Sequence, residues 1–275
     1  MIGLLALKLV LSPTLIAMIT LAGRRWGSAV AGWLAGLPIT GGPILLILTL
    51  QRGEAYTAAT ARSSMVGAAA FAAFCIAFVF VARRCGWWWA LVAGYIAYAA
   101  MMPLCAAIHP STAVAALIGG SALLGCAMVL PQGPVIEVRD HSPWELPLRM
   151  TSAAAIVLVV TGLAHVLDPR WIGVLSIFPT AATVLGVFTH RSEGPNGAAR
   201  VLRALTLGML GYIAFLTVVT ATLEAWGLVP AFGLALLTSF AAQATLWAVL
   251  TVYRRRFNVR APTHESSPAS PPPPA

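Results

Sequence analysis

The sequence predicts an all-α, polytopic membrane protein of about nine transmembrane helices, arranged as two inverted-topology repeats. Three observations lead to this fold class. The composition is too apolar for a soluble domain, and the apolar residues fall into nine runs of membrane-spanning length. Two of these runs are also interrupted by proline and small residues at a constant separation along the chain.

The composition excludes most soluble classes. Of the 275 residues, 59% are hydrophobic and only 9% are charged, and the mean hydropathy is +0.87. A soluble domain carries about 25% charged residues. The net charge of +9 comes from short basic groups near the ends of apolar runs, a distribution that is typical of membrane topology signals and does not favour nucleic-acid binding. The four cysteines form no CxxC pair, so we expect no metal and no cofactor.

The apolar runs predict nine spans joined mostly by short connections. They cover residues 2–21, 29–50, 57–81, 88–108, 112–130, 148–167, 171–189, 201–223 and 229–253. We expect an integral membrane domain at 1–253, made of repeat one at 1–108, a linking fifth helix at 112–130 and repeat two at 142–253. Residues 254–275 read as a basic and then proline-rich cytoplasmic tail that is disordered.

The second span is interrupted in its middle. The stretch Gly32–Pro43 contains Pro38 and the adjacent Gly41 and Gly42, which break helices. In hydrocarbon, the freed backbone groups are tolerated only where they face protein or a water-filled cavity. The sequence therefore predicts a polar backbone site at membrane depth with Thr40 as its hydroxyl. The alternative interpretation is a proline kink packed against a neighbouring helix.

The seventh span carries a matching interruption at Pro179, followed by Thr180 and Thr183. Aligning Pro38 with Pro179 gives an offset of 141 residues. Without any gap, the same offset pairs Lys8 with Arg149, Gly32 with Gly173, Gly53 with Gly194, Arg62 with Arg203, Gly67 with Gly208, Gly86 with Gly227, Phe71 with Tyr212 and Phe74 with Phe215. Such a set is difficult to obtain by chance, so it predicts an internal duplication.

The basic residues predict the topology. With nine spans, one side of the membrane receives Arg24, Arg25, Arg83, Arg84, Arg139, Arg149, Arg191, Arg200, Arg203, Arg254, Arg255, Arg256 and Arg260, and the other receives Lys8, Arg52, Arg62 and Arg170. The excess places the N-terminus outside and the C-terminus in the cytoplasm. Since five spans separate equivalent helices, the two copies enter the membrane from opposite faces, as in many secondary transporters. Ten spans, with a broken helix split in two, would remove this charge asymmetry.

Basic side chains within the spans suggest the chemistry of a substrate site. A charge inside a span is a functional hypothesis by default, although long basic side chains near helix ends also snorkel to the interface. No Asp or Glu lies well inside a span, so basic residues, hydroxyls and free amides favour an anion. The expected substrate-binding residues are Lys8, Pro38, Thr40, Gly41, Gly42, Arg62, Arg149, Pro179, Thr180, Thr183 and Arg203.

The second copy resembles the GlpM-type small bacterial membrane proteins, which have four predicted spans. The matching positions are Arg149, Gly173, Phe178, Pro179, Thr180, Glu193, Gly194 and Arg203. The first copy keeps Lys8, Gly32, Pro38, Gly53 and Arg62 but has Leu37 and Ile39 where the pattern has Phe and Thr. The whole chain also resembles double-length bacterial membrane proteins with a Gly-Leu-Pro-x-Thr-x-Gly-Pro signature. The resemblance implies fold and membrane location, and it brings no activity with it.

Together these features predict a multi-pass protein of the bacterial inner membrane that transports or flips an anionic or zwitterionic small solute or lipid headgroup. The alternative is a non-transporting membrane partner or assembly subunit. An enzyme is not expected, because the histidines are dispersed and no HExxH, GxSxG or phosphate-loop pattern occurs. The expected partners are membrane lipid and the solute or headgroup, with a homodimer as one candidate assembly and no nucleic acid.

Overall fold

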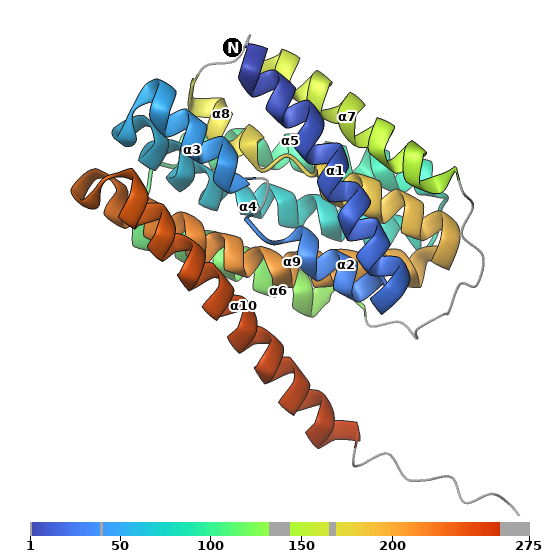
Figure 1. Ribbon diagram of the computed structural model, residues 1–275. Coiled ribbons are helices and arrows are strands. Elements are labelled where there is room, and N and C mark those ends of the chain that lie inside the picture. The colour runs from blue at the N-terminus through green and yellow to red at the C-terminus, as the bar shows by residue number, and fades with distance from the viewer. Residues whose placement is uncertain (1, 39–40, 132–143, 165–168, 259–275) are drawn as a thin grey trace, which may run out of the picture.

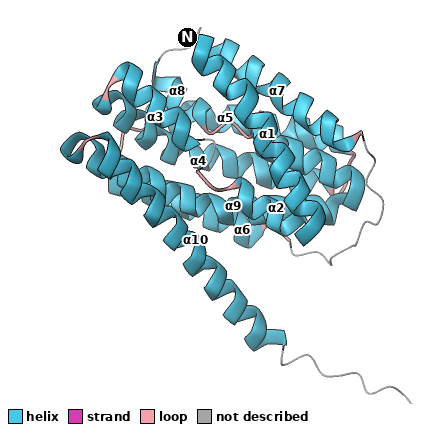
Figure 2. Cartoon of the chain, viewed as in Figure 1, coloured by secondary structure: helices cyan, strands magenta, loops and turns pink. Residues whose placement is uncertain are grey.

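The computed structural model describes residues 2–38, 41–131, 144–164 and 169–258, and every regular element in these ranges is a helix (Figure 2). The prediction of an all-α fold is confirmed for this part of the chain. The helices are α1 (Ile2–Trp26), α2 (Ser28–Ala35), α3 (Gly41–Arg52), α4 (Glu54–Ala82), α5 (Trp87–Ala107), α6 (Thr112–Val129), α7 (Glu145–Ala164), α8 (Pro169–Ser176), α9 (Thr180–Trp226) and α10 (Leu228–Asn258). Thr40, most of the linker between α6 and α7, and the tail from Val259 lie outside the described residues.

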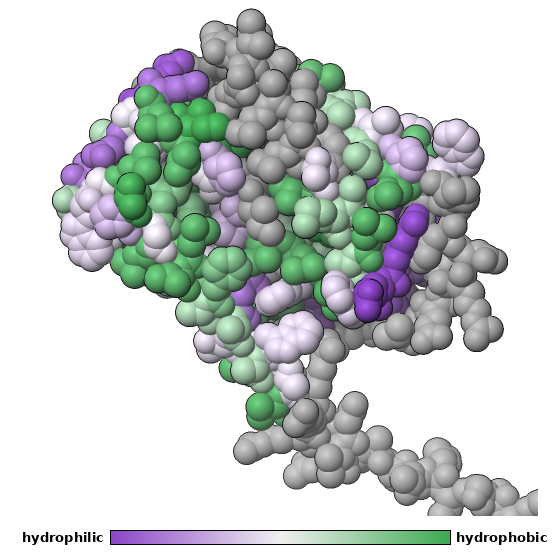
Figure 3. Space-filling view, viewed as in Figure 1, coloured by the Kyte–Doolittle hydropathy of each residue, from purple (hydrophilic) through white to green (hydrophobic). Residues whose placement is uncertain are grey.

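Several helices suit a membrane. Within the described residues, five segments are long and apolar enough to cross a bilayer: Glu54–Ala82, Trp87–Ala107, Thr112–Val129, Val174–Trp226 and Leu228–Val249. Hydrophobic residues form a broad band on the visible face, with hydrophilic residues toward two opposite ends (Figure 3). The helices α2, α3 and α8 have 8, 12 and 8 residues, each short of the roughly 20 residues that a span needs. The count of nine spans stays a prediction.

The centre of the fold is formed by α4 and α9, which pack against each other (Figure 1). α6 packs on both of them, α5 packs on α4, and α10 packs on α9. α2 lies along α9, α8 lies against α4, and α1 lies beside α7. The aromatic rings of Phe74, Phe78 and Phe215 are fully buried at this centre. α10 extends away from the body and continues to Asn258, so the cluster Arg254–Arg256 is helical, although the predicted span ended at Tyr253.

Helix boundaries recur at one separation along the chain. α2 begins at Ser28 and α8 at Pro169, 141 residues later, and the two helices have the same length. α5 begins at Trp87 and α10 at Leu228, again 141 residues apart. We refer to α1 to α5 as the first half of the described chain and to α7 to α10 as the second half, with α6 between them.

Two glycines at equivalent positions share an unusual backbone conformation. Gly53 precedes α4 with φ 86° and ψ 173°, and Gly194 lies inside α9 with φ 73° and ψ −172°. Residues other than glycine rarely adopt this region. Gly194 therefore divides α9 into two helical parts, residues 180–193 and 195–226, as Gly53 separates α3 from α4.

Candidate functional site

The first interruption lies between α2 and α3. The amide of Gly36 bonds to the carbonyl of Trp33 at 3.2 Å, and the amide of Gly42 bonds to the carbonyl of Pro38 at 2.8 Å. Pro38 is buried. These backbone bonds continue on both sides of the break, so at least part of the polar backbone there is satisfied within the chain.

Side chains and backbone of α9 fill the space beside this break. A Cβ atom added to Gly36 would overlap the backbone of Gly208, and one added to Gly41 would overlap the ring of Tyr212. One added to Gly42 would lie 3.6 Å from Phe215. The predicted site residues Gly41 and Gly42 thus contact aromatic rings, an arrangement closer to the packed kink than to an open cavity.

The second interruption lies between α8 and α9 and is lined by hydroxyl groups. Pro179 is the N-cap of α9, and its carbonyl accepts a bond from the amide of Thr183 at 2.8 Å. The Thr183 hydroxyl lies 2.9 Å from the Tyr95 hydroxyl of α5. The amide of Thr180 bonds to the carbonyl of Phe178 at 2.7 Å. The first turn of α9 therefore holds Pro179, Thr180 and Thr183 next to Tyr95 of α5, and their role in binding a substrate stays a prediction.

A second tyrosine of α5 completes the lining. Tyr98 donates its hydroxyl hydrogen to the carbonyl of Val174 at 3.0 Å, in the last turn of α8. The Phe178 ring lies 5.5 Å from both tyrosine rings, stacked on Tyr95 and edge-on to Tyr98. Ser64 and Ser176 also meet at 2.6 Å. None of these residues was predicted from the sequence to belong to a site, although the three-residue spacing of the tyrosines places them on one helix face.

The two breaks contact the central helices through equivalent glycines. A Cβ added to Gly208 would lie 2.5 Å from the Trp33 carbonyl oxygen and 3.2 Å from Gly36 Cα. One added to Gly67 would lie 3.1 Å from Val174 Cα and 3.4 Å from Ile177. Gly67, Val174 and Ile177 are related to Gly208, Trp33 and Gly36 by the same 141-residue offset. Each half thus packs its short helix on a glycine of the other half.

Arg62 and Arg203 lie at opposite ends of α6. Arg203 donates from Nε to the carbonyl of Ala127 at 2.6 Å, in the last turn of α6. Carbonyls there have no partner within the helix and attract cations. Arg62 instead neighbours Pro110, just before α6 begins, and its buried Nε has no hydrogen-bond partner among the described residues. The structure therefore does not bring the two arginines into one site.

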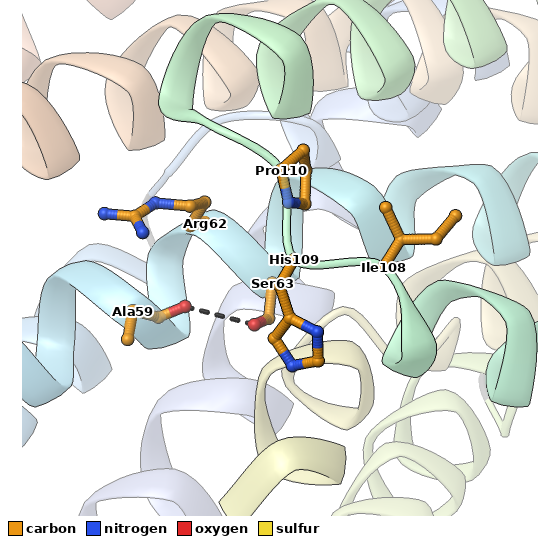
Figure 4. A pocket seen from close by; sticks show the side chains of 6 residues that line it. All are labelled: Ala59, Arg62, Ser63, Ile108, His109 and Pro110. Atoms are coloured by element: carbon orange, nitrogen blue, oxygen red, sulfur yellow. Dashed lines mark hydrogen bonds between the residues drawn. The ribbon is translucent and has the colours of Figure 1, made fainter.

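A small pocket of about 80 Å³ lies beside Arg62 (Figure 4). It is lined by Ala59, Arg62, Ser63, Ile108, His109 and Pro110. The Ser63 hydroxyl is occupied by the carbonyl of Ala59 at 3.1 Å, and the Arg62 guanidinium points away from His109. The lining holds no carboxylate, and the first-turn amides of α6 begin next to it. Arg62 is thus the one arginine or lysine of the lining, and its guanidinium lies at the edge of the pocket.

Arg149 lies elsewhere, on α7. Its side chain is only 7% exposed, and its guanidinium carbon lies 5.2 Å from the centre of the Phe188 ring of α9. This cation–π contact accounts for burying part of the charge. The Lys8 side chain lies outside the described residues, so its predicted pairing with the site stays a prediction.

No family model, curated protein or solved structure matches the chain. The resemblance to the GlpM-type proteins therefore stays a prediction. Within the described residues, no group of three or more His, Cys, Asp or Glu side chains is placed to hold a metal ion.

Proposed function

We propose that this chain is a transporter or flippase of the bacterial inner membrane, built from two inverted repeats, for a small anionic or zwitterionic solute or lipid headgroup. The helix boundaries that recur at 141 residues support the repeat. So do the reciprocal contacts of Gly67 and Gly208 and the shared conformation of Gly53 and Gly194. An inverted pair of this kind is the common plan of secondary transporters.

The observation that carries the choice of an anion is the difference between Arg62 and Arg203. The first arginine borders a pocket with its Nε unbonded, whereas the second is held by the Ala127 carbonyl. A buried guanidinium nitrogen without a partner is costly, because the desolvation of that group is not compensated. An anion in the pocket would supply the partner, and the N-terminal dipole of α6 would favour the same charge.

In this proposal, Arg62 binds the anion at the outer end of the molecule and Arg203 stabilises α6 at the cytoplasmic end. The pocket is small, so it admits one phosphate- or carboxylate-sized group and not a whole metabolite. The hydroxyl groups at the break between α8 and α9 lie deeper in the fold and provide uncharged hydrogen-bond partners for the rest of the substrate path. This differs from the sequence-based hypothesis, which placed both arginines at one substrate site.

The test is uptake into liposomes that contain the purified protein, with phosphate and small carboxylates as probes and a fluorescent anionic phospholipid for flipping. A lost charge-assisted contact corresponds to about 1.5–3 kcal/mol, or roughly a tenfold to hundredfold weaker interaction. Arg62→Gln should weaken uptake by that factor without lowering thermal stability, because the buried nitrogen that it removes has no partner among the described residues. Arg52→Gln is the matched control, because Arg52 is exposed at the end of the neighbouring helix, with its guanidinium carbon 5.6 Å from the centre of the Tyr56 ring. Unchanged uptake in Arg62→Gln would overturn the anion site.

Topology is tested separately by cysteine labelling. Single cysteines beside Gly53 and beside Gly194 lie at equivalent positions of the two halves. Inverted repeats require that the first be labelled from outside and the second from the cytoplasm. Labelling of both from one face would contradict the proposed inversion whatever the uptake assay shows.

The second candidate is a non-transporting membrane partner or assembly subunit. The close packing of Gly36 on Gly208 favours it, because it fills the space beside the first break. Correct topology and full stability, with no uptake of any probe in the liposomes, would select this function.

A further inference from the structure

Three polar atoms between α2 and α10 are buried without a hydrogen-bond partner among the described residues. They are the Ser239 hydroxyl, the Gln243 side-chain carbonyl and the Trp33 indole nitrogen. Ser239 is 0% exposed and Gln243 is 2% exposed. Buried polar groups are nearly always bonded, so three orphans at neighbouring positions require an explanation.

Two of the three residues, Gln243 and Trp33, meet at Gly208 of α9. Gln243 donates from Nε2 to the carbonyl of Gly208 at 2.7 Å, and the Trp33 carbonyl lies against the same glycine. Ser239 precedes Gln243 by one helical turn on the same face of α10. The Trp33 ring lies 5.4 Å from Trp247, one further turn along that face.

The residues at the second break show what is different here. At the 141-residue offset, Ser239 corresponds to Tyr98, Trp33 to Val174 and Gln243 to Met102. At the second break, Tyr98 of α5 donates its hydroxyl hydrogen to the carbonyl of Val174 of α8. At the first break, the aromatic ring belongs to α2 as Trp33, and α10 carries the short Ser239. Neither the Ser239 hydroxyl nor the Trp33 indole N–H has a hydrogen-bond partner among the described residues.

We propose that Ser239, Gln243 and Trp33 form a buried, uncharged site that binds one neutral O–H group, either a water molecule or a hydroxyl of a small solute. The hydrogen-bonding capacities fit such a group. The indole N–H donates, the Gln243 carbonyl accepts, and the Ser239 hydroxyl does either, so one O–H group makes three bonds. Three is the usual number for a buried water. No charged side chain takes part, so this site is separate from the Arg62 pocket and does not depend on the proposed transport.

The test removes one polar atom at a time and measures the thermal midpoint of the full chain in detergent. If the atoms bind an O–H group, Ser239→Ala and Trp33→Phe should each lower the midpoint by about 2–4 °C. The midpoint of the double variant should then fall by less than the sum of the two single decreases, because both side chains bind the same group. If the hydroxyl is truly unbonded, Ser239→Ala should leave the midpoint unchanged or raise it, and this result overturns the site.

Two control variants test whether the decrease in midpoint is specific to the buried site, and a glycerol series distinguishes bound water from a bound solute. Ser121→Ala and Trp226→Phe remove the same groups from exposed positions and should leave the midpoint within about 1 °C. Repeating the series with glycerol separates the sources. A difference between wild type and variants that grows with glycerol indicates a solute hydroxyl, and a constant difference indicates water. An experimental structure with no density between the three atoms would also overturn the proposal.

Discussion

The two helix breaks each follow a short helix of eight residues, and they differ in the contacts that stabilise them. The break between α2 and α3 is held by close backbone approach, with Gly36 against Gly208. The break between α8 and α9 is held by side chains, with Tyr98 on the Val174 carbonyl and Tyr95 on Thr183. In a membrane, small residues at helix contacts and interhelical hydrogen bonds are the two available means of association. Here each half relies mainly on a different one.

The direction of α6 explains why Arg62 and Arg203 have different surroundings. A helix has direction, so its two ends cannot offer the same groups to a pair of equivalent side chains. Arg203 meets carbonyls at the C-terminal end, whereas Arg62 lies near the amides of the N-terminal end. One linking helix thus gives equivalent residues of two halves different chemistry.

The largest expected effect is at the glycine contact of the first break. Gly208→Ala places a Cβ 2.5 Å from the Trp33 carbonyl, where rigid backbone has to move. We expect the free energy of unfolding to fall by about 3 kcal/mol or more, which is the upper part of the range for overpacking. Gly67→Ala should cost less, since its nearest atom is 3.1 Å away. Gly233→Ala is the control with open space around it. Equal thermal midpoints for Gly208→Ala and Gly67→Ala would contradict the comparison of the two breaks.

The next largest effect is a difference in stability between variants of the two arginines, Arg203 and Arg62. Arg203→Gln removes a charge-assisted bond to the Ala127 carbonyl and should destabilise the protein by about 1.5–3 kcal/mol. Arg62→Gln removes no such bond at Nε and should leave the unfolding midpoint unchanged or raise it. Thermal unfolding of both variants in one detergent decides between them. Equal losses would mean that the two arginines have the same structural role.

The two halves should respond alike at Gly53 and Gly194. Both have φ values that L side chains rarely adopt, and neither has an atom within 4 Å of an added Cβ. Gly53→Ala and Gly194→Ala should therefore each cost about 1–3 kcal/mol through backbone strain alone. Gly120→Ala on α6 is the control, because its backbone is helical and its surroundings are open. A large difference between the two losses, measured by denaturant unfolding, would weaken the equivalence of the halves.

The smallest effect concerns the hydroxyl at the second break. Tyr98→Phe deletes one bond to the Val174 carbonyl and keeps the ring. Interhelical hydrogen bonds in membranes contribute about 0.6 kcal/mol on average, so the midpoint should fall slightly. Tyr56→Phe, on α4 and away from the break, supplies the comparison. A gain in stability in Tyr98→Phe would show that the hydroxyl does not hold the second break.

Much of the backbone could be predicted from the sequence. Pro38, Pro179 and the glycines around them marked where helices end, because proline and glycine act locally on backbone conformation. The starts of α5 and α10 could be predicted from Gly86 and Gly227 for the same reason. The low charge content predicted apolar helices because charged side chains are costly in hydrocarbon.

Side-chain partners could not be predicted in this way. In α4 and α5, exposed residues such as Phe80 and Ile96 are as apolar as buried ones such as Phe74, so hydropathy does not reveal which face is buried. Tyr95 and Tyr98 gave no sign that they line the second break, and Arg62 and Arg203 gave no sign that they lie at opposite ends of α6. The sequence by itself determined where the chain breaks and, to within about five residues, where most helices begin and end, because these are largely local properties. Only the tertiary structure decided which side chains meet, because that depends on packing between helices whose surfaces are alike.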